Sequence, residues 1–500
     1  MSILYEGRMD WLLSWPRAGL RAFTQALIGL RPRVRRLVPR RLHHMTGQAV
    51  RWLIRNIETM GAGSDDVDTF APAAAPLFKS EAFAAGPILH ANTALVWGGA
   101  ERQLVNVLKG LPGRLERPVG LLCLRLGESP ELDFFLPELA GSVPPTRNAM
   151  DEAAAAAQLK QVGGALVASE IVEALAWAPK DFVADVLRFA GEFAAQRPRV
   201  VHGWQEGAGL TAGFAALAVG VPRIVVAGRN LRPANFSHYR PHMYTAYWQL
   251  AAEPRVILCN NSEAGARDYA AWLGMDPARI RVVRNGIDED RVRRIQGAEV
   301  KAFRGQLGVP EGAPLIGSMF RLYPEKRPLL WVRAAQLICQ RVPEAHFAVF
   351  GSGAMETHFV REGIRRGLGG RLRLLPPTQE LSLALSALDV FVLTSQYEGT
   401  PNVVLEAGLA GVPVVAMEAG AVAETVLEGR TGYVVQDRGA SMSDDDRAAS
   451  IADRVIAILR DAAWRHQVTR TAPEFVRTHY GMERMLTETL ALYGLGNERS

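Results

Sequence analysis

The sequence has few cysteines, and they are far apart. Its 500 residues include three, Cys123, Cys259 and Cys339, with no Cys-x-x-Cys pair and no spacing typical of metal ligands. This scarcity argues against a disulfide framework and against a thiolate metal site, and it is typical of a reducing compartment. We expect the three cysteines to be small core residues.

Long hydrophobic runs are absent as well. The longest candidate for a membrane span, residues 207–221, is followed by Pro222 and Arg223 and is too short to cross a bilayer. Arginines interrupt the N-terminal apolar run, so it does not match a cleavable secretory signal. With 48% hydrophobic and 22% charged residues, the composition is typical of a soluble globular protein, and the length predicts two or three domains.

Residues 1–60 lack lysine but hold eleven arginines and three acidic residues, a net charge of +8. Since the whole chain carries +6, the other 440 residues carry −2, and no nucleic-acid partner is expected for the body of the protein. Within residues 9–57, two stretches place apolar side chains on one helical face and arginines on another, which favours an anionic membrane surface. A helical arm packed on the body, a segment that pairs with a partner protein and an organelle transit peptide remain open as alternatives.

Alternating strand-like and helix-like runs, together with 47 glycines, favour an α/β architecture. Three acidic residues at 444–446 are expected to cap a helix over residues 447–459 rather than to bind a metal. Apolar runs typical of buried parallel strands occur in both halves of the chain, among them residues 88–90, 199–205, 224–226, 315–320, 347–350, 390–393 and 412–415.

One stretch combines the features of an anion-binding site. After an apolar strand comes a turn at residues 398–401, and then apolar residues at helical spacing. We expect Thr400 to cap this helix, with Pro401 as its first residue, so that the free amides of the first turn point over the strand end. Glu398 in the loop and Glu406 inside the helix would then lie on either side of a phosphate-sized site.

The seven residues between Glu398 and Glu406 give a spacing that resembles the paired-glutamate signature of the retaining family-4 glycosyltransferases with the GT-B fold. The resemblance covers residues from about 86 to 495 and is strongest over residues 280–435, where several motifs occur in order. It implies an α/β protein with two Rossmann-like domains facing a cleft, in which the second domain holds a nucleotide-sugar donor and the first holds the acceptor.

A segment similar to the family's Asn-Gly-Ile-Asp, which starts at Asn285, marks the crossing into the second domain. The chain is therefore expected to have four parts: a basic amphipathic extension and linker over 1–80, an acceptor domain over 81–285, a donor domain over 286–478, and a C-terminal helix over 479–500 that crosses back to the first domain.

The resemblance also implies roles for individual residues. Glu398 would accept hydrogen bonds from hydroxyls of the donor sugar, and Glu406 from the ribose hydroxyls. Arg321 and Lys326, five residues apart on a loop after a strand, would hold the diphosphate and stabilise the leaving group. Further donor contacts are expected at the glycine-rich loops and the helix start, namely at Gly98, Gly99, Gly351, Gly399, Thr400, Pro401 and Asn402.

The strand around residue 202 departs from the family pattern. His202 matches the first of two cleft histidines, so we expect it in the catalytic group. Trp204 occupies the second histidine position, and whether His202, Gln205 or Glu206 replaces that histidine stays open. On the acceptor side we expect Gln205, Arg229 and Asn230.

The predicted reaction is the transfer of a hexose, with retention, from a nucleotide sugar to a carbohydrate or lipid-linked acceptor, as in bacterial exopolysaccharide or envelope assembly. Because two cations and a helix N-terminus would neutralise the leaving group, no metal or other cofactor is expected. We expect a cytoplasmic protein that lies peripherally on the inner face of the cytoplasmic membrane. The alternatives are a nucleotide-sugar epimerase or hydrolase on the same fold and a non-catalytic component of a polysaccharide secretion complex. A dehydrogenase is disfavoured, because Glu356 stands where the dinucleotide fingerprint needs its third glycine.

Overall fold

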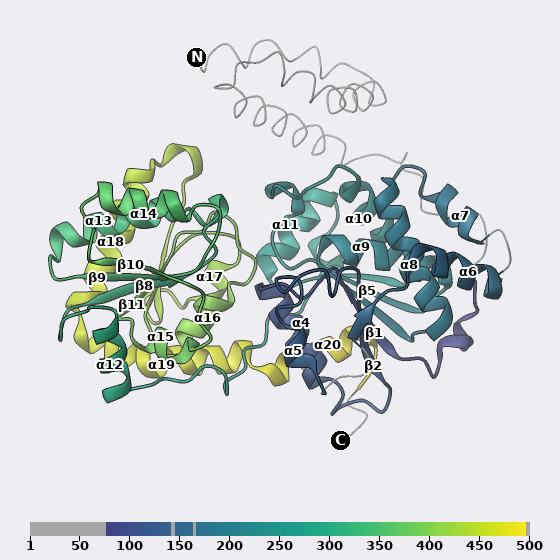
Figure 1. Cartoon of the computed structure of the whole chain (residues 1–500), viewed down its shortest axis with the longest axis horizontal. Coiled ribbons are helices and arrows are strands. Elements are labelled where there is room, and N and C mark those ends of the chain that lie inside the picture. Colours follow the sequence, from purple (N-terminus) through teal and green to yellow (C-terminus); the bar gives the residue numbers. More distant parts are fainter. Residues whose placement is uncertain (1–76, 142–145, 164–166, 497–500) are drawn as a thin grey trace, which may run out of the picture.

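The computed structural model of the protein describes residues 77–141, 146–163 and 167–496. The predicted amphipathic arm, residues 9–57, lies outside these ranges. The described chain forms two domains that lie side by side, the first coloured purple to teal and the second green (Figure 1). Each domain is built around a parallel sheet, so the predicted architecture of two Rossmann-like α/β domains is confirmed.

The first domain is built around seven parallel strands in the order β3-β2-β1-β4-β5-β6-β7. Strands β1, β2 and β4 are buried along their whole length, as expected for apolar runs that are covered on both faces. The strands are β1 (Ile88–Asn92), β2 (Val119–Cys123), β3 (Thr146–Asn148), β4 (Val200–Trp204), β5 (Arg223–Ala227), β6 (Val256–Asn260) and β7 (Arg281–Val282).

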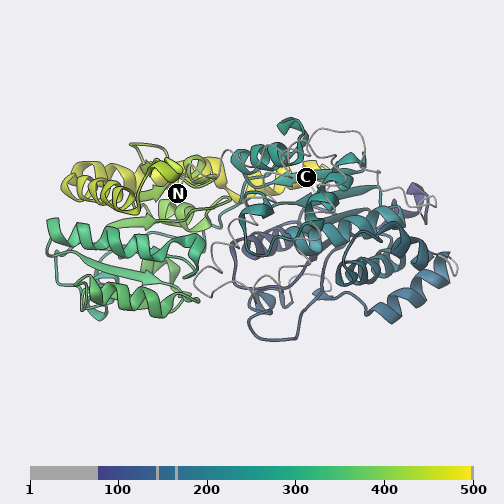
Figure 2. The ribbon, with the colours of Figure 1, turned by 90° about the horizontal axis from the view of Figure 1, so that it is seen from above.

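Helices pack on both faces of this sheet (Figures 1 and 2). The apolar stretch after residue 205 forms an almost fully buried helix rather than a membrane span. No helix of the described residues is both long enough and apolar enough to span a bilayer. The helices are α4 (Gly99–Gly110), α5 (Leu136–Leu139), α6 (Glu152–Gly163), α7 (Val167–Ala174), α8 (Lys180–Gln196), α9 (Glu206–Val219), α10 (His242–Ala252) and α11 (Glu263–Leu273).

The second domain has six parallel strands in the order β10-β9-β8-β11-β12-β13. These strands are β8 (Leu315–Met319), β9 (His346–Phe350), β10 (Leu372–Leu375), β11 (Val390–Leu393), β12 (Val414–Met417) and β13 (Gly432–Val435). Its helices are α12 (Ala298–Gln306), α13 (Pro328–Arg341), α14 (Glu356–Arg365), α15 (Leu381–Ser386), α16 (Asn402–Leu409), α17 (Val422–Thr425) and α18 (Asp444–Arg460).

The acidic run at the start of α18 caps that helix, as predicted. Ser443 Oγ accepts a hydrogen bond from the backbone N–H of Asp446, and the Asp446 carboxylate accepts one from the backbone N–H of Ser443. These acids also lie at the positive end of the helix dipole. The helix begins at Asp444, three residues before its predicted start.

Each sheet has one point at which the strand order reverses. In the first sheet β1 lies between β2 and β4, and in the second β8 lies between β9 and β11. Open parallel sheets bind their ligands at the carboxyl ends of the strands that flank this point. The loops after β1, β4, β8 and β11 are therefore the places to look for a site.

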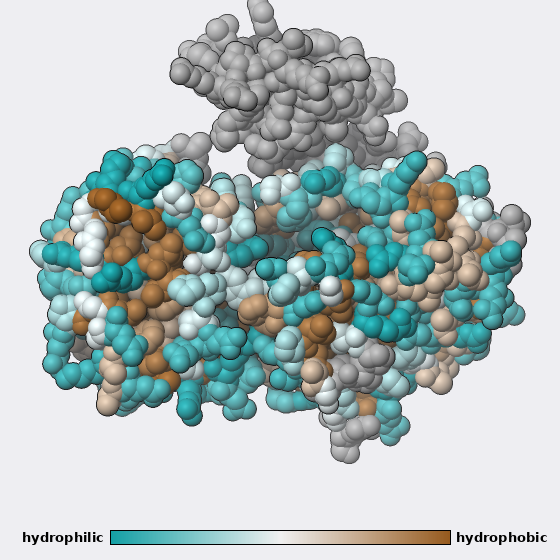
Figure 3. Space-filling model, viewed as in Figure 1, coloured by the Kyte–Doolittle hydropathy of each residue, from teal (hydrophilic) through white to brown (hydrophobic). Residues whose placement is uncertain are grey.

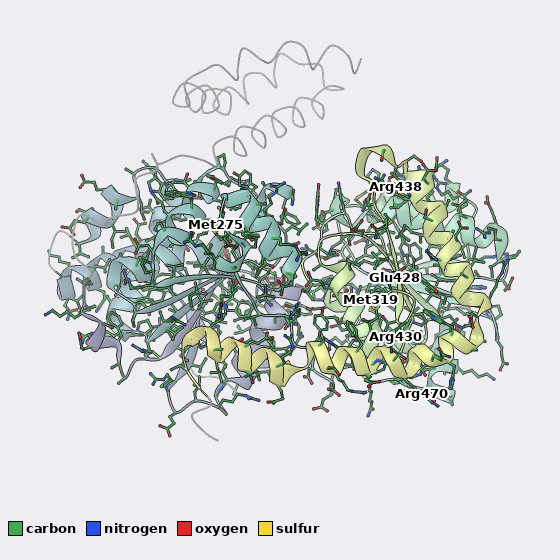
Figure 4. The ribbon with its side chains drawn as sticks, turned by 180° about the vertical axis from the view of Figure 1, so that it is seen from behind. Met275, Met319, Glu428, Arg430, Arg438 and Arg470 are labelled. Atoms are coloured by element: carbon green, nitrogen blue, oxygen red, sulfur yellow. The ribbon has the colours of Figure 1, made fainter. Side chains whose placement is uncertain are left out.

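Two C-terminal helices connect the domains. Helix α19 (Ala462–Tyr480) packs on α16 of the second domain, and α20 (Met482–Tyr493) packs on α4 and β5 of the first. Figure 4 shows both helices, in yellow, running along one edge of the molecule from one domain to the other. Next to Gly481, which separates them, the Ile287 N–H donates to the carbonyl of Tyr480 at 2.8 Å, so the two crossings of the chain lie side by side.

Candidate active site

Two loops of the second domain are held together where the sheet order reverses. The loop after β8 ends at Arg327, whose backbone is in the left-handed region with φ of 48°. Its guanidinium donates to the carbonyl oxygens of Thr394 and Ser395 and to the carboxylate of Asp437, each at 2.9 Å. These bonds fix the loop after β8 against the loop after β11.

This clamp brings two predicted site residues into contact. Lys326 Nζ donates to Glu398 Oε1 at 2.5 Å, and the two side chains are only 17% and 9% exposed. The hydroxyl of Thr394 also donates to the carbonyl of Lys326 at 2.9 Å, which fixes the backbone that carries the cation. One cation and one acid thus meet at the carboxyl edge of the sheet, while the roles predicted for them toward a donor stay predictions.

Arg321 begins the same loop and is more exposed. Its side chain is 52% exposed, with the carboxylate of Glu325 3.9 Å away and the ring centre of Tyr323 5.6 Å away. Burial raises the pKa of Glu101 in the first domain, and the charge of Arg321 partly opposes that rise. The charge of Arg321 therefore acts across the junction between the domains, while its guanidinium makes few contacts on its own loop.

The loop before α16 makes polar contacts with the first domain. Asn285 Nδ2 donates to Asn402 Oδ1 at 2.6 Å and to the carbonyl of Thr400 at 3.2 Å. Asn402 Nδ2 donates in turn to the carbonyl of Gly99 at 3.1 Å, so the glycine-rich loop after β1 and the helix start of the second domain are in direct contact. In Figure 3 most of the residues visible where the two domains meet are hydrophilic, in keeping with this polar junction.

The expectation that Thr400 caps this helix is wrong. The N-cap is Pro401, which cannot make a side-chain hydrogen bond. The Thr400 hydroxyl donates instead to the carbonyl of Asn261 in the first domain at 2.7 Å. It therefore does not cap the free N–H groups at the start of α16. At Gly399 a Cβ atom would lie 2.5 Å from the carbonyl oxygen of Arg229, so only glycine permits this close approach of the two domains.

The carboxyl of Glu406 is influenced by arginines of both domains. It is partly buried on α16, and burial raises the pKa of its carboxyl, while the charges of Arg291 and Arg102 oppose that rise. Arg102 itself makes a bidentate pair with Glu138, both bonds at 2.6 Å, and Arg291 lies 3.8 Å from the same carboxylate. The ribose-binding role of Glu406 stays a prediction.

The structure places His202 in a buried aromatic cluster. The side chain is 3% exposed, its ring lies 4.8 Å from that of Trp204, and its Nδ1 is 2.8 Å from the hydroxyl of Tyr493 on α20. Trp204 Nε1 donates to His90 Nδ1 at 3.0 Å. Burial and nearby positive charge lower the pKa of His202 well below 6.5. In this position His202 anchors the C-terminal helix, and no described contact links it to Lys326 or Glu398.

The predicted acceptor-side residues Arg229 and Asn230 make polar contacts within the first domain. The Arg229 guanidinium donates to Asn285 Oδ1 at 2.7 Å and lies 4.7 Å from the ring centre of Trp204, and burial lowers its pKa to about 10. The carbonyl of Asn230 accepts a hydrogen bond from Asn260 Nδ2 at 3.0 Å. These contacts give both residues a structural role, whatever they do toward an acceptor.

The two remaining glycine positions mark close packing. A Cβ at Gly351 would lie 2.0 Å from the carbonyl oxygen of Phe320, so this glycine lets the ends of β8 and β9 approach each other. A Cβ at Gly98 would lie 2.2 Å from Glu101 Oε2, which means that the Glu101 carboxylate rests against the glycine-rich loop.

Sequence reasoning missed Glu101. It is 6% exposed, and its Oε1 accepts a hydrogen bond from Gln205 Nε2 at 2.6 Å. Burial raises the pKa of its carboxyl, although the hydrogen bond and the charges of Arg321 and Arg229 lower it. An acid in the first turn of a helix is common for electrostatic reasons, so no local pattern indicates that this one is enclosed.

A cavity of about 500 Å³ opens in the first domain at the carboxyl ends of β1, β2 and β4. Charged side chains of both signs and aromatic rings line it, a mixture suited to a carbohydrate with several hydroxyl groups. Its lining includes Thr93, Arg125, Asp181, Phe182, Glu206 and His242. Within residues 77–141, 146–163 and 167–496, no three histidine, cysteine, aspartate or glutamate side chains are grouped closely enough to hold a metal ion.

Comparison with known families assigns each domain. Residues 97–291 match the family model described as "Glycosyltransferase Family 4", and residues 299–475 match the model "Glycosyl transferases group 1". The chain carries both domains of a glycosyltransferase. One model falls on each sheet, and together they include the loops after β4, β8 and β11; the first model begins at residue 97, near the end of the loop after β1.

Relatives among characterised proteins point the same way. The chain is 26% identical over 408 residues to the Vi polysaccharide biosynthesis protein VipC/TviE of Salmonella typhi, which covers 78% of this chain and 68% of that protein. It is 30% identical over 243 residues to D-inositol 3-phosphate glycosyltransferase 2 of Catenulispora acidiphila, covering 45% and 55%. The chain thus spans about half the length of this second relative.

Solved structures share the fold. Anabaena Alr3699/HepE in complex with UDP and glucose superimposes with a TM-score of 0.62 at 20% identity, covering 82% of this chain and 99% of that one. WaaG, a glycosyltransferase involved in lipopolysaccharide biosynthesis, gives a TM-score of 0.56 at 12% identity, covering 81% and 100%. These likenesses confirm the predicted GT-B fold.

Proposed function

We propose that this protein transfers a sugar, with retention of anomeric configuration, from a nucleotide sugar to a carbohydrate acceptor during polysaccharide assembly. The observation that carries the proposal is the Lys326–Glu398 pair at the carboxyl edge of the second sheet. It lies where parallel sheets bind ligands, and the half-exposed Arg321 lies on the same loop as Lys326.

In the proposed complex the donor diphosphate takes the place of the Glu398 carboxylate as the partner of Lys326. A diphosphate carries more charge than one carboxylate, and the partly exposed guanidinium of Arg321 adds a second cation. Glu398, once released, accepts hydrogen bonds from hydroxyls of the donor sugar, and Glu406 accepts them from the ribose. The two cations stabilise the departing diphosphate, and we propose that no metal is required for this step.

The relatives support the choice of substrates. The Salmonella protein is named for polysaccharide biosynthesis, and HepE was crystallised with UDP and glucose, so we propose a UDP-sugar donor and a saccharide acceptor. The mixed cavity of the first domain is the proposed place for the acceptor. A lipid-linked acceptor at the inner face of the cytoplasmic membrane is proposed from the arginine-rich amphipathic pattern of residues 9–57.

The test uses the full-length protein with a panel of nucleotide sugars that includes UDP-glucose. One member should raise the melting temperature, and Lys326→Ala should weaken its binding roughly 10- to 100-fold, because a charge-assisted hydrogen bond is lost. Lys301→Ala is the matched control, since that lysine pairs with Glu311 on an exposed surface. A donor that binds both variants as tightly as it binds the wild type would show that the donor site is misplaced.

Product analysis separates the alternatives. With labelled donor alone, an epimerase forms a new nucleotide sugar, whereas a transferase forms a glycoside only when an acceptor is supplied. The anomeric configuration of that glycoside, read by NMR, tests retention. A new nucleotide sugar formed without acceptor would contradict the transferase proposal.

A further inference from the structure

The first sheet reverses its strand order between β1 and β4, and two side chains meet there. Glu101 lies in the first turn of α4, which follows the glycine-rich loop after β1. Gln205 is the residue that directly follows β4. Their hydrogen bond, 2.6 Å long, therefore spans the point at which a sheet of this kind binds its ligand.

Gln205 holds this position in a strained conformation. Its φ of 60° and ψ of 177° fall in a region that is essentially reserved for glycine. Its backbone N–H donates to the carbonyl of Ala227 at 3.0 Å, and its carbonyl accepts the N–H of Gly209, so the strain is fixed from both sides. Glycine would adopt this backbone conformation without strain. A glutamine is nevertheless present, which indicates that its side chain has a role.

The retained side chain has one described partner, the carboxylate of Glu101. That carboxylate is held on one side by Gln205 and lies on another against Gly98. Arg321 of the second domain and Arg229 of the first are near enough for their charges to act on it. Glu101 is thus an enclosed acid at the strand-order reversal of the first sheet, and the charge of Arg321, the cation proposed to hold the donor diphosphate, acts on it.

We propose that Glu101 binds the acceptor hydroxyl that attacks the donor sugar and that Gln205 is its positioning residue, an inference that rests on the proposed function. A carboxylate accepts a hydrogen bond from a hydroxyl group and so fixes the direction of its lone pair. In the first domain it would do for the acceptor what Glu398 does for the donor sugar in the second. The ligand class is therefore a saccharide hydroxyl, presented from the first domain toward Arg321.

The variant Glu101→Gln distinguishes acceptor binding from a purely structural role of Glu101. The amide oxygen of glutamine still accepts a hydrogen bond from Gln205, so a purely structural role would survive the change. The proposal requires transfer to octyl β-glucoside or another octyl glycoside used by the wild type to fall roughly 10- to 100-fold, mostly in kcat. Binding of UDP and acceptor-independent hydrolysis of the donor should stay within about twofold.

Glu173→Gln, an exposed glutamate on α7, is the matched control and should match the wild type in every assay. If Glu101→Gln transfers sugar as fast as the wild type, the inference is overturned. If it loses hydrolysis and UDP binding together with transfer, Glu101 serves the donor and the inference is also overturned. A wild-type protein that binds no nucleotide sugar contradicts the proposed function itself, which is a different outcome.

Gln205→Gly gives a second, independent readout. Glycine relieves the backbone strain, and this gain offsets the loss of the hydrogen bond to the buried Glu101, so the melting temperature should change little, while transfer falls because Glu101 loses its partner. The pH profile of transfer should shift as well, because the hydrogen bond from Gln205 lowers the pKa of Glu101. A variant with unchanged transfer and an unchanged profile would show that Gln205 does not position the acid.

Discussion

At the scale of single residues, the ion pair between Lys326 and Glu398 makes a prediction about stability. Replacing Lys326 by methionine leaves the carboxylate of Glu398, whose side chain is 9% exposed, without its cation, which should cost about 3 kcal/mol of unfolding free energy. The double variant Lys326→Met with Glu398→Gln should recover most of that loss, because no charge is left unpaired. Urea denaturation of both variants measures the difference, and equal stabilities would mean that the pair is not coupled.

His90 predicts how stability depends on pH. Burial lowers its pKa from 6.5 to about 3, so the folded protein keeps it neutral over a range in which the unfolded chain takes up a proton. Below pH 6.5 the unfolded state binds more protons, and unfolding free energy therefore falls as pH falls, by up to about 1.4 kcal/mol per pH unit from this residue. His202, whose pKa is also lowered by burial, should add to the same slope.

Denaturation at pH 7, 6 and 5 tests this prediction against a control. His90→Gln should flatten the slope, since glutamine does not titrate. His358→Gln, on the exposed face of α14, should keep the slope of the wild type. A wild-type protein equally stable at all three pH values would contradict the burial of the histidines.

At the scale of elements, the position of Lys326 depends on a clamp between two loops. Arg327→Ala removes two hydrogen bonds to carbonyl oxygens of the segment after β11 and one to the Asp437 carboxylate after β13, and it leaves the two carbonyl oxygens without their donor. We expect donor affinity to fall roughly tenfold although Arg327 need not touch the donor. Arg327→Lys should not restore donor affinity, because an ammonium group cannot reproduce the hydrogen-bond geometry of the guanidinium.

Arg333→Ala is the control for this element. Arg333 pairs with Asp445 at 2.9 Å on the surface, and that aspartate is 83% exposed, so its loss should leave donor affinity unchanged. Isothermal titration with UDP gives the comparison. Equal affinities of the Arg327 and Arg333 variants would show that the clamp does not set the donor site.

At the scale of the whole molecule, one glutamate of the second domain caps a helix of the first. The carboxylate of Glu424 on α17 accepts the backbone N–H groups of Glu263 and Ala264, at 3.1 and 2.7 Å, in the first turn of α11. Capping contacts of this kind contribute about 1 kcal/mol. Because this one exists only while the domains are together, it stabilises the observed arrangement relative to a separated one.

Glu424→Ala should therefore speed amide exchange at the start of α11 without affecting α13, and mass spectrometry of exchanged peptides measures this. Glu428→Ala is the control (Figure 4). Its carboxylate accepts the N–H of Val434 within the second domain, so its loss should leave α11 unchanged. Unchanged exchange in the Glu424 variant would show that the cap does not hold the junction.

The sequence by itself determined which segments form the two parallel sheets, and it placed Lys326 and Glu398 on loops that follow strands. Their direct pairing was not predicted. Apolar runs, turn residues and helical spacing are local signals, and the carboxyl ends of neighbouring parallel strands must meet at one edge. The start of α16 failed as a prediction, because the hydroxyl of Thr400 bonds to a residue of the other domain that no local pattern reveals.

Only the tertiary structure decided which polar groups are enclosed. In the folded protein His202 contacts Tyr493 of the last helix, and Glu101 accepts a hydrogen bond from Gln205. Those partners are more than a hundred residues apart or lie on separate elements, so burial and hydrogen bonding at each residue depend on how the sheets, the junction and the returning helix pack together. The sequence specifies the chemical type of each side chain, but packing between distant segments determines its burial and its hydrogen-bond partners.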